Sequence, residues 1–135
     1  VERSLTGHRD DVIGIDYSPE NRCLATGSDD GTIKIYDTRT WKLAHSIETN
    51  GAKPRQPANE VKRVAFSRDG GLLAAACSAG HVLVYDAASP GSPVASLSAH
   101  DDTVFGVAWG RSKQGARVLI SASHDYSCNY WLQQS

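Results

Sequence analysis

A turn followed by an alternating strand constrains this chain more than any other stretch. Residues 26–37 read TGSDDGTIKIYD, in which apolar Ile33 and Ile35 alternate with more polar neighbours. Alternation with a period of two is typical of a β-strand that buries one face. The Asp-Asp-Gly sequence before it favours a tight turn, and residues 23–26 form a short, β-prone run ahead of that turn. The stretch therefore predicts a β-hairpin.

The hairpin pattern recurs twice along the chain. Residues 73–86 read LAAACSAGHVLVYD, and residues 119–132 read LISASHDYSCNYWL. The aligned aromatic residues Tyr36, Tyr85 and Trp131 are separated by 49 and 46 residues. A self-similar period of this length indicates a repeat architecture, in which one small unit is stacked several times.

Each hairpin has a strand before it, and the first two also have one after it. We expect first strands at 12–17, 61–66 and 103–109, hairpins within 23–37, 72–86 and 118–132, and fourth strands at 41–48 and 94–97. A further short strand is expected at residues 1–5. Turns rich in Gly, Pro, Asp and Ser separate these runs, and no stretch sustains a helical period. The chain is therefore predicted to be all-β, as one domain with units at about 6–48, 57–97 and 99–132.

The composition excludes several classes of protein. The chain is 40% hydrophobic with a net charge of −1, so it is neither disordered by composition nor an electrostatic nucleic-acid binder. No apolar run approaches membrane-spanning length and no signal-peptide pattern is present, so we expect no membrane association. Cys23, Cys77 and Cys128 are widely spaced without a C-x-x-C pair. Such cysteines argue against a disulfide framework and favour an intracellular compartment, cytoplasmic or nuclear.

At this point the sequence resembles the WD-repeat β-propeller family over essentially its whole length. The residues that carry the resemblance are Gly7-His8, residues 27–37 with Tyr36-Asp37 in the Trp-Asp place, Ala99-His100, residues 123–125 and Trp131. Blades of this family have four strands and about 40–45 residues. The resemblance therefore implies β-propeller blades, as three four-stranded antiparallel units. It also implies that residues 1–5 belong to a neighbouring blade.

The resemblance implies a buried hydrogen-bond chain in each blade. An indole N–H donates to a hydroxyl on the second strand, that hydroxyl bonds a histidine from the loop before the first strand, and the histidine bonds an aspartate in the hairpin turn. The first unit has three of the four groups, with Tyr36 at the indole position: His8, Ser28 and Asp30. The third unit has all four, with Leu132 after the indole residue: His100, Ser123, Asp125 and Trp131. The second unit has Pro57, Cys77 and Ala79 instead, so its network is predicted to be absent.

Some of these residues also suggest chemistry. Ser123, His100 and Asp125 match the residue types of a hydrolase triad, but no G-x-S-x-G motif accompanies them and the structural network uses the same residues. His124 and Cys128 are four residues apart, but no second close pair completes a metal site. The cysteines are interpreted as small buried core thiols. We therefore predict no enzyme activity, no catalytic residue, no metal and no cofactor.

Basic residues occur in two separate turns. One set lies in or beside the loop at 49–60 and the other on the opposite rim: Lys53, Arg55, Lys62 and Arg63, and Arg111, Lys113 and Arg117. The first set could contact phosphate or an acidic partner, or simply be solvated. Two separated basic turns do not make one nucleic-acid footprint, so nucleic acid is not the expected partner. A nucleic-acid-contacting or enzymatic domain built on the same blades is kept as the alternative function.

The resemblance places partner binding on the rim that carries the histidine loops and hairpin turns. The side chains facing that rim flank each first strand or precede the turn aspartate: Asp11, Ile13, Asp29, Glu60, Lys62, Ser78, Thr103, Phe105 and His124. Exposed Ile13 and Phe105 among acids would form a peptide hot spot, whereas partial burial would make them packing residues. The chain is predicted to be a non-enzymatic scaffold that binds a protein or peptide within a multiprotein complex.

Three blades are fewer than the four to eight of closed propellers. The sequence has no methionine and begins at Val1, which favours a piece of a longer propeller. In the alternative arrangement, two copies assemble head to tail, and each residue 1–5 strand completes the other copy's last blade. The two arrangements remain open at the level of sequence.

Overall fold

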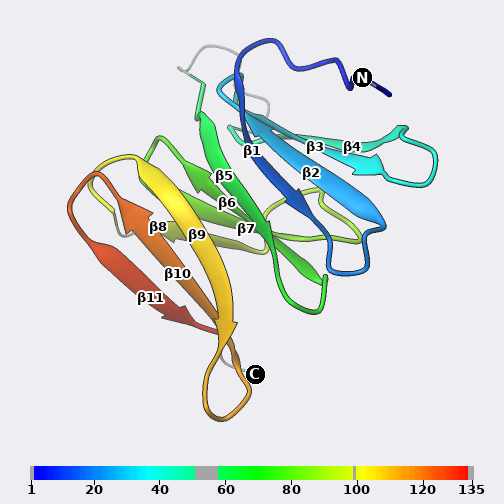
Figure 1. Cartoon of the computed structure of the whole chain (residues 1–135). Coiled ribbons are helices and arrows are strands. Elements are labelled where there is room, and N and C mark those ends of the chain that lie inside the picture. The colour runs from blue at the N-terminus through cyan, green and yellow to red at the C-terminus, as the bar shows by residue number, and fades with distance from the viewer. Residues whose placement is uncertain (1, 51–57, 99, 134–135) are drawn as a thin grey trace.

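The computed structural model describes residues 2–50, 58–98 and 100–133, and these contain eleven strands and no helix. Three antiparallel sheets stand side by side like leaves of a fan (Figure 1). The first sheet contains β1 (Val12–Tyr17), β2 (Cys23–Ser28), β3 (Thr32–Asp37) and β4 (Leu43–Glu48). The middle sheet contains β5 (Val61–Phe66), β6 (Leu72–Cys77), β7 (His81–Asp86) and β8 (Ala95–Ser98). The third sheet contains β9 (Val104–Arg111), β10 (Arg117–Ser123) and β11 (Cys128–Leu132).

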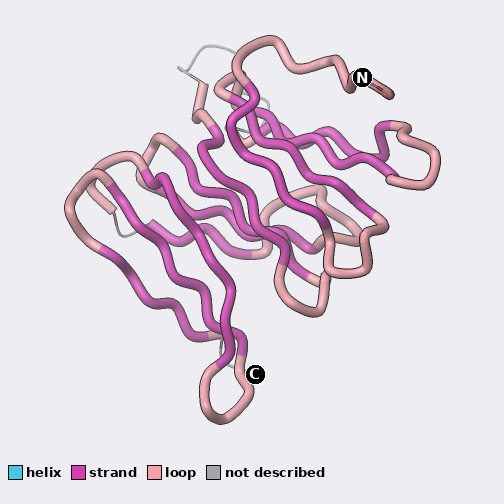
Figure 2. The backbone as a smooth tube through the Cα atoms, viewed as in Figure 1, coloured by secondary structure: helices cyan, strands magenta, loops and turns pink. Residues whose placement is uncertain are grey.

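Every strand pairs with its neighbour in sequence, so each sheet is a simple meander. The loops therefore gather at the two ends of the sheets, which form two rims (Figure 2). The predicted all-β fold of three repeat units is confirmed, and the sheets do not close into a ring. The third sheet has three strands in the described residues, as the sequence predicted.

Two strand predictions need correction. No strand is assigned to residues 2–5, because a β-ladder requires a partner strand and none lies beside them. Their role in a neighbouring blade stays a prediction. The fourth strand of the first sheet begins at Leu43, because Trp41 adopts a positive φ of 58° that a strand does not allow.

The middle sheet is buried on both faces. Alternate residues of β6 point to opposite sides: Leu73 and Ala75 join a core with the first sheet, and Ala74 and Ala76 join a core with the third sheet. All four are fully buried. The small alanines let neighbouring sheets approach closely, as does Gly27, where an added Cβ would lie 2.5 Å from Val61 Cγ1.

The first strands of the three sheets lie next to one another along the inner side of the fan (Figure 1). The backbone N–H of Phe66 in β5 donates to Asp16 Oδ2 in β1 over 2.8 Å. The indole of Trp109 in β9 donates to the Ala65 carbonyl in β5 over 2.9 Å. These two links fix the angle between successive sheets, and hence the relative positions of the loops at each rim.

The three hairpin turns place one residue each in the left-handed region. Gly31 and Gly80 occupy this position in the first and middle sheets, with φ of 81° and 83°. Tyr126 occupies it in the third sheet, with φ of 69°. Glycine adopts this conformation without steric cost, whereas a tyrosine does not.

Candidate functional site

A buried polar network fastens the third sheet to the loop that precedes it. The side chain of His100 is fully buried. Its Nδ1 lies 2.9 Å from Asp125 Oδ2, and its Nε2 lies 2.8 Å from Ser121 Oγ. The indole of Trp131 donates to the same Ser121 oxygen over 3.1 Å. Because an ionised carboxylate only accepts, Nδ1 carries a proton, and in the neutral imidazole Nε2 accepts from the Ser121 hydroxyl.

The aspartate of this network is held in its ionised form. Hydrogen bonds from the Ser127 hydroxyl, from His100 and from the Asp101 N–H hold the pKa of Asp125 well below its usual range. The network thus joins a loop, a hairpin turn and two strands through one chain of donors and acceptors. A chain of this kind fixes the loop rigidly, since breaking any member leaves a buried group unpaired.

The first sheet has a shorter version of the same network. His8 Nδ1 lies 3.1 Å from Asp30 Oδ2, and His8 Nε2 lies 2.8 Å from Thr26 Oγ1. Burial favours a higher pKa for Asp30, but hydrogen bonds from Thr32, Arg9 and His8 outweigh it and hold that pKa well below its usual range. Tyr36 is buried at the indole position, and its hydroxyl makes no hydrogen bond to the described residues.

The hydroxyl in each network lies two residues earlier than predicted. The sequence assigned this role to Ser28 and Ser123, but the structure gives it to Thr26 and Ser121. Ser28 and Ser123 instead accept the N–H groups of their turn aspartates, each over 3.1 Å. Residues i and i+2 lie on the same face of a strand, so pattern alone could not separate the two candidates.

The middle sheet has no such network in the described residues. Ala75 is fully buried at the position of Thr26 and Ser121, and Ala79 stands at the turn position. Pro57, at the histidine position, lies outside the described residues. Asn59, which the sequence reasoning missed, performs part of the task because its Oδ1 accepts the Ala79 N–H over 3.0 Å. A buried asparagine just before a first strand was the signal that could have revealed it.

The hydrolase interpretation does not fit this geometry. His100 bonds Ser121 rather than Ser123, and Ser121 is fully buried beneath the indole of Trp131. A nucleophile without solvent access cannot meet a substrate. Ser123 donates to the Thr103 carbonyl over 2.9 Å, away from the histidine. These residues therefore act as structural groups.

The cysteines and histidines that were considered as metal ligands do not form a metal site in the described residues. No group of three or more His, Cys, Asp or Glu positioned to hold a metal occurs within residues 2–50, 58–98 and 100–133. Of the three cysteines, Cys77 is buried, Cys23 is partly buried and Cys128 is exposed. The interpretation of all three as buried core thiols is therefore wrong for Cys128, which lies on β11 at the open side of the third sheet. Burial raises the pKa of the Cys77 thiol to about 12.

The loops that the networks hold form what we call the His-loop rim. It consists of residues 8–11, 28–31, 58–60, 77–80, 100–103 and 123–126, together with the adjoining side chains of Ile13, Lys62 and Phe105. Nine of these residues were predicted from sequence to face a partner, and hydrogen bonds, ion pairs and a ring contact connect eight of them into one row.

The row begins at the first sheet and crosses to the middle sheet through an ion pair. The N–H of Asp29 donates to the Asp11 carbonyl over 2.9 Å. Lys62 Nζ lies 2.8 Å from Asp29 Oδ1 and 2.5 Å from Glu60 Oε2. Burial disfavours the charged lysine, but the two carboxylates outweigh it and raise its pKa. Lys62 is therefore a bridge between the first and middle sheets rather than a free cation.

The row continues across the middle sheet to the third. The N–H of Glu60 donates to Ser78 Oγ over 2.9 Å, and the Thr103 hydroxyl donates to the Ser78 carbonyl over 3.2 Å. The N–H of His124 donates to the Thr103 carbonyl over 3.0 Å. The row ends where the rings of Phe105 and His124 meet, with centroids 4.2 Å apart.

The remaining member, Ile13, lies on β1 near the start of the row. Ile13 is 49% exposed and Phe105 is 45% exposed, so neither is a packing residue of the described core. The two apolar side chains stand at opposite ends of the row, among acidic loops. The rim itself carries eight carboxylates against two cations, Arg9 and Lys62.

The basic residues are divided between the two rims. Lys62 belongs to the ion pairs of the His-loop rim, and Arg63 is exposed on β5. At the opposite rim Arg117 Nε donates to Asp69 Oδ2 over 2.8 Å and joins the third sheet to the middle one. Hydrogen bonds from the Ser67 hydroxyl, the Gly71 N–H and Arg117 hold the pKa of Asp69 well below its usual range. Lys53 and Arg55 lie outside the described residues.

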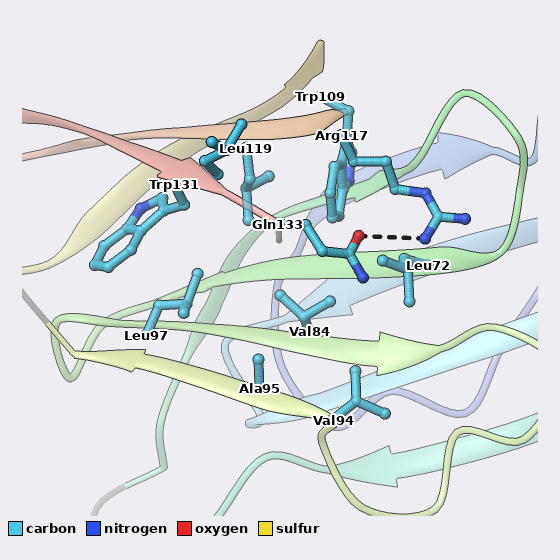
Figure 3. Close-up of a pocket in the computed structure, with 11 residues that line it drawn as sticks. Leu72, Val84, Val94, Ala95, Leu97, Trp109, Arg117, Leu119, Trp131 and Gln133 are labelled. Carbon is cyan, nitrogen blue, oxygen red and sulfur yellow. Dashed lines mark hydrogen bonds between the residues drawn. The ribbon is translucent and has the colours of Figure 1, made fainter. Parts of the chain in front are cut away.

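A cavity of about 330 Å³ opens between the middle and third sheets, and Arg117 of the opposite rim contributes to its lining. Figure 3 shows its apolar lining, which includes Trp109, Trp131 and Leu97. Arg117 Nη1 donates to Gln133 Oε1 over 3.2 Å at its edge. The cavity lies beside β11, where the third sheet has no fourth strand in the described residues.

With the geometry established, comparison with known proteins identifies the family. A family model described as the nucleolar protein 10-like, N-terminal domain, a β-propeller, matches residues 2–131. The chain belongs to this family. Its three sheets are WD-repeat blades, as the resemblance implied.

Other relatives share part of their length with this member of the nucleolar protein 10-like family. A guanine nucleotide-binding protein subunit beta from Zea mays is 38% identical over 87 residues, which cover 62% of this chain and 22% of that protein. The nuclear distribution protein PAC1 from Arthroderma otae is 32% identical over 97% of this chain and 28% of its own length. The chain thus spans about a quarter of these two relatives.

Solved structures agree with the blade assignment. A structure titled "Crystal structure of RRP9 WD40 repeats" superposes with a TM-score of 0.83 at 27% identity, over 96% of this chain and 37% of that one. A structure titled "Structure of U3-55K" gives the same TM-score at 26% identity, over 96% and 38%. The part of the chain that the structure describes contains no helix capable of spanning a membrane.

Proposed function

We propose that this chain is a non-catalytic scaffold that binds a protein or peptide on the His-loop rim. The observation that carries the proposal is the connected row of residues from Asp11 to Phe105, linked through both backbone and side-chain groups. It takes residues from all three sheets and joins them through hydrogen bonds, an ion pair and a ring contact. Loops held in this way on a rigid β frame offer a preorganised surface, which lowers the entropic cost of binding.

The relatives support a role inside assemblies. Two relatives carry subunit names, the guanine nucleotide-binding protein subunit beta and the eukaryotic translation initiation factor 3 subunit I from Phaeosphaeria nodorum. The nucleolar name of the matched family supports an intracellular location for this chain. A protein partner within a multiprotein complex is therefore the best-supported ligand class.

The alternative functions have less support. The serine, histidine and aspartate that suggested a hydrolase are committed to a buried network. The rim is strongly acidic, which repels phosphate backbones. A head-to-tail homodimer remains a proposal for the isolated chain, and light scattering tests it by showing either twice the monomer mass or the monomer mass alone.

The proposal is tested by co-purification from native lysate, with quantitative mass spectrometry of the captured proteins. The bait is the full-length natural chain that contains these residues, compared with a rim variant carrying Asp11→Ala, Phe105→Ala and His124→Ala. The matched control carries Arg39→Ala, Arg68→Ala and Lys113→Ala on the opposite rim. We expect specific proteins to be lost from the rim variant and retained by the control, with melting temperatures nearly unchanged. Equal recovery by both variants, or loss only from the control, would overturn the proposal.

A further inference from the structure

The rim of the third sheet differs from the other two in a way that the fold does not require. Tyr126 lies in the left-handed region where the other hairpins have Gly31 and Gly80, and its side chain is fully exposed. The tyrosine thus occupies a strained backbone position without burying any surface in return. Strain of this kind is a pointer to function, because glycine at this position would remove it.

Two further aromatic rings lie near Tyr126: His124 in the same hairpin turn, and Phe105 at the start of β9. Phe105 and His124 are exposed and in contact, with a tilt of 39° between their planes. The corresponding positions hold Ile13 and Asp29 in the first sheet, and Lys62 and Ser78 in the middle sheet. Exposed aromatic rings therefore gather at one end of the rim only. We call Phe105, His124 and Tyr126 the aromatic corner.

Exposed carboxylates flank the aromatic corner. The N–H of Asp101 donates to Asp125 Oδ2 over 3.1 Å, and the Asp102 carbonyl accepts from the Ser123 hydroxyl over 3.1 Å. These bonds hold the loop of Asp101 and Asp102 against the turn that carries two of the three rings. Neither carboxylate forms an ion pair with a cation of the described residues. Asp102 Oδ1 accepts the Thr103 N–H over 2.6 Å, which leaves its other oxygen and the Asp101 carboxylate to face a ligand.

We propose that the aromatic corner binds an arginine or lysine side chain of a peptide segment of the partner. This rests on the proposed function and names the chemistry of its ligand. A cation above an aromatic ring is attracted by the electrons of its face, and carboxylates beside the ring strengthen that attraction. Arginine is preferred over lysine, because its planar guanidinium stacks on a ring while donating to carboxylates at its edge. An apolar peptide would leave the carboxylates unpaired, and a nucleic acid would be repelled by them.

Fluorescence anisotropy with synthetic peptides tests this proposal in the full-length natural chain. The probes are labelled twelve-residue Gly-Ser peptides that carry three arginines, three lysines or three citrullines, the last being neutral and nearly isosteric with arginine. We expect the arginine peptide to bind at least about tenfold more tightly than the citrulline peptide, with the lysine peptide between them. The double variant Asp101→Asn, Asp102→Asn is expected to reduce the ratio of the affinity for the arginine peptide to that for the citrulline peptide.

Tyr126→Gly is the decisive variant, because it removes a ring and relieves the backbone strain, so the protein stays folded. We expect it to weaken arginine-peptide binding by about threefold to tenfold. Trp41→Gly is the matched control, since Trp41 is also an aromatic residue at positive φ but lies on the opposite rim. The control should bind like the wild type. Equal affinity for arginine and citrulline peptides, or equal loss in both variants, overturns the proposal.

Failure here is distinguishable from failure of the proposed function. If the triple rim variant loses its co-purifying proteins while arginine and citrulline peptides bind alike, the rim binds a partner but the aromatic corner is not a cation site. If the rim variant retains every protein, the scaffold role of this rim fails as well.

Discussion

The middle sheet and the third sheet fasten their rim loops in opposite ways. The third sheet uses a buried chain of polar groups from Asp125 through His100 and Ser121 to Trp131. The middle sheet places alanine at two of the corresponding positions and relies on tight apolar packing, with single hydrogen bonds to Asn59 Oδ1 and Ser78 Oγ in its rim loops. The same antiparallel meander therefore tolerates either filling, with polar groups paired to one another in the third sheet and apolar side chains packed against one another in the middle sheet.

The polar network and the apolar packing each have a disadvantage. A polar network fixes geometry through direction, but every member depends on the others. Apolar packing has no such dependence, but it demands close fit, as at Gly80, where an added Cβ would lie 2.5 Å from the His100 carbonyl. The turn of the middle sheet thus rests directly on the histidine loop of the third. Substitutions can test whether the stability of the middle sheet depends on close packing and that of the third sheet on paired polar groups.

The largest effect is expected from Gly80→Ala. The change combines a left-handed backbone position with a backbone clash, and together these should lower the free energy of unfolding by about 3 kcal/mol. Gly31→Ala has a nearly equal φ, but its Cβ would be 3.4 Å from the Ala58 Cβ, so only the conformational cost of about 1–2 kcal/mol applies. Chemical denaturation measures both. Equal losses would show that the middle sheet does not depend on close fit.

A smaller effect is expected from Trp131→Phe. It removes the indole donor from Ser121 and should lower the free energy of unfolding by about 1–3 kcal/mol. The matched change in the first sheet is Tyr36→Phe, which removes a hydroxyl that makes no hydrogen bond to the described residues. That change should cost less than about 0.5 kcal/mol. If Tyr36→Phe proved as costly as Trp131→Phe, the first network would extend to the phenol after all.

The smallest effect is expected in the response to acid. The pKa of Asp30 is held below its usual range in the folded state, so its stabilising contribution is present above the unfolded pKa of about 4 and is lost as pH falls below it. Asp30→Asn should therefore flatten the fall in melting temperature between about pH 5 and pH 2. Asp11→Asn removes a carboxyl outside the networks and controls for the change in net charge. An unchanged acid profile for Asp30→Asn would contradict the network's part in acid sensitivity.

The sequence was sufficient for the fold because its signals are local. Alternation and turn residues located all eleven strands to within a few positions, and sheets built from sequential hairpins need no further information. The sequence predicted every member of the third-sheet network except the serine. It pointed to Ser123 instead of Ser121 because the two residues share one face of β10. The strand predicted at the N-terminus is not observed at residues 2–5. A strand forms only beside a partner strand, and the residue pattern of a segment does not show whether a partner is present.

The site was less predictable because it depends on contacts between sheets. The sequence placed Lys62 and Asp29 on one rim, but their ion pair follows from the angle between the first and middle sheets. The ring contact of Phe105 with His124 likewise depends on how a loop meets a hairpin turn. The sequence did not point to Tyr126, because tyrosine is not a residue type that favours the left-handed backbone conformation. Its alignment with Gly31 and Gly80 was the available signal.

The meander order of every sheet also shapes how the chain folds. Each strand pairs only with its neighbour in sequence, so each sheet can form from local contacts before it meets another, which favours rapid folding. Order can then spread from sheet to sheet along the fan, as in other repeat proteins. The middle sheet, packed on both faces, is the element that both neighbours protect, and we expect its backbone amides to exchange with solvent last.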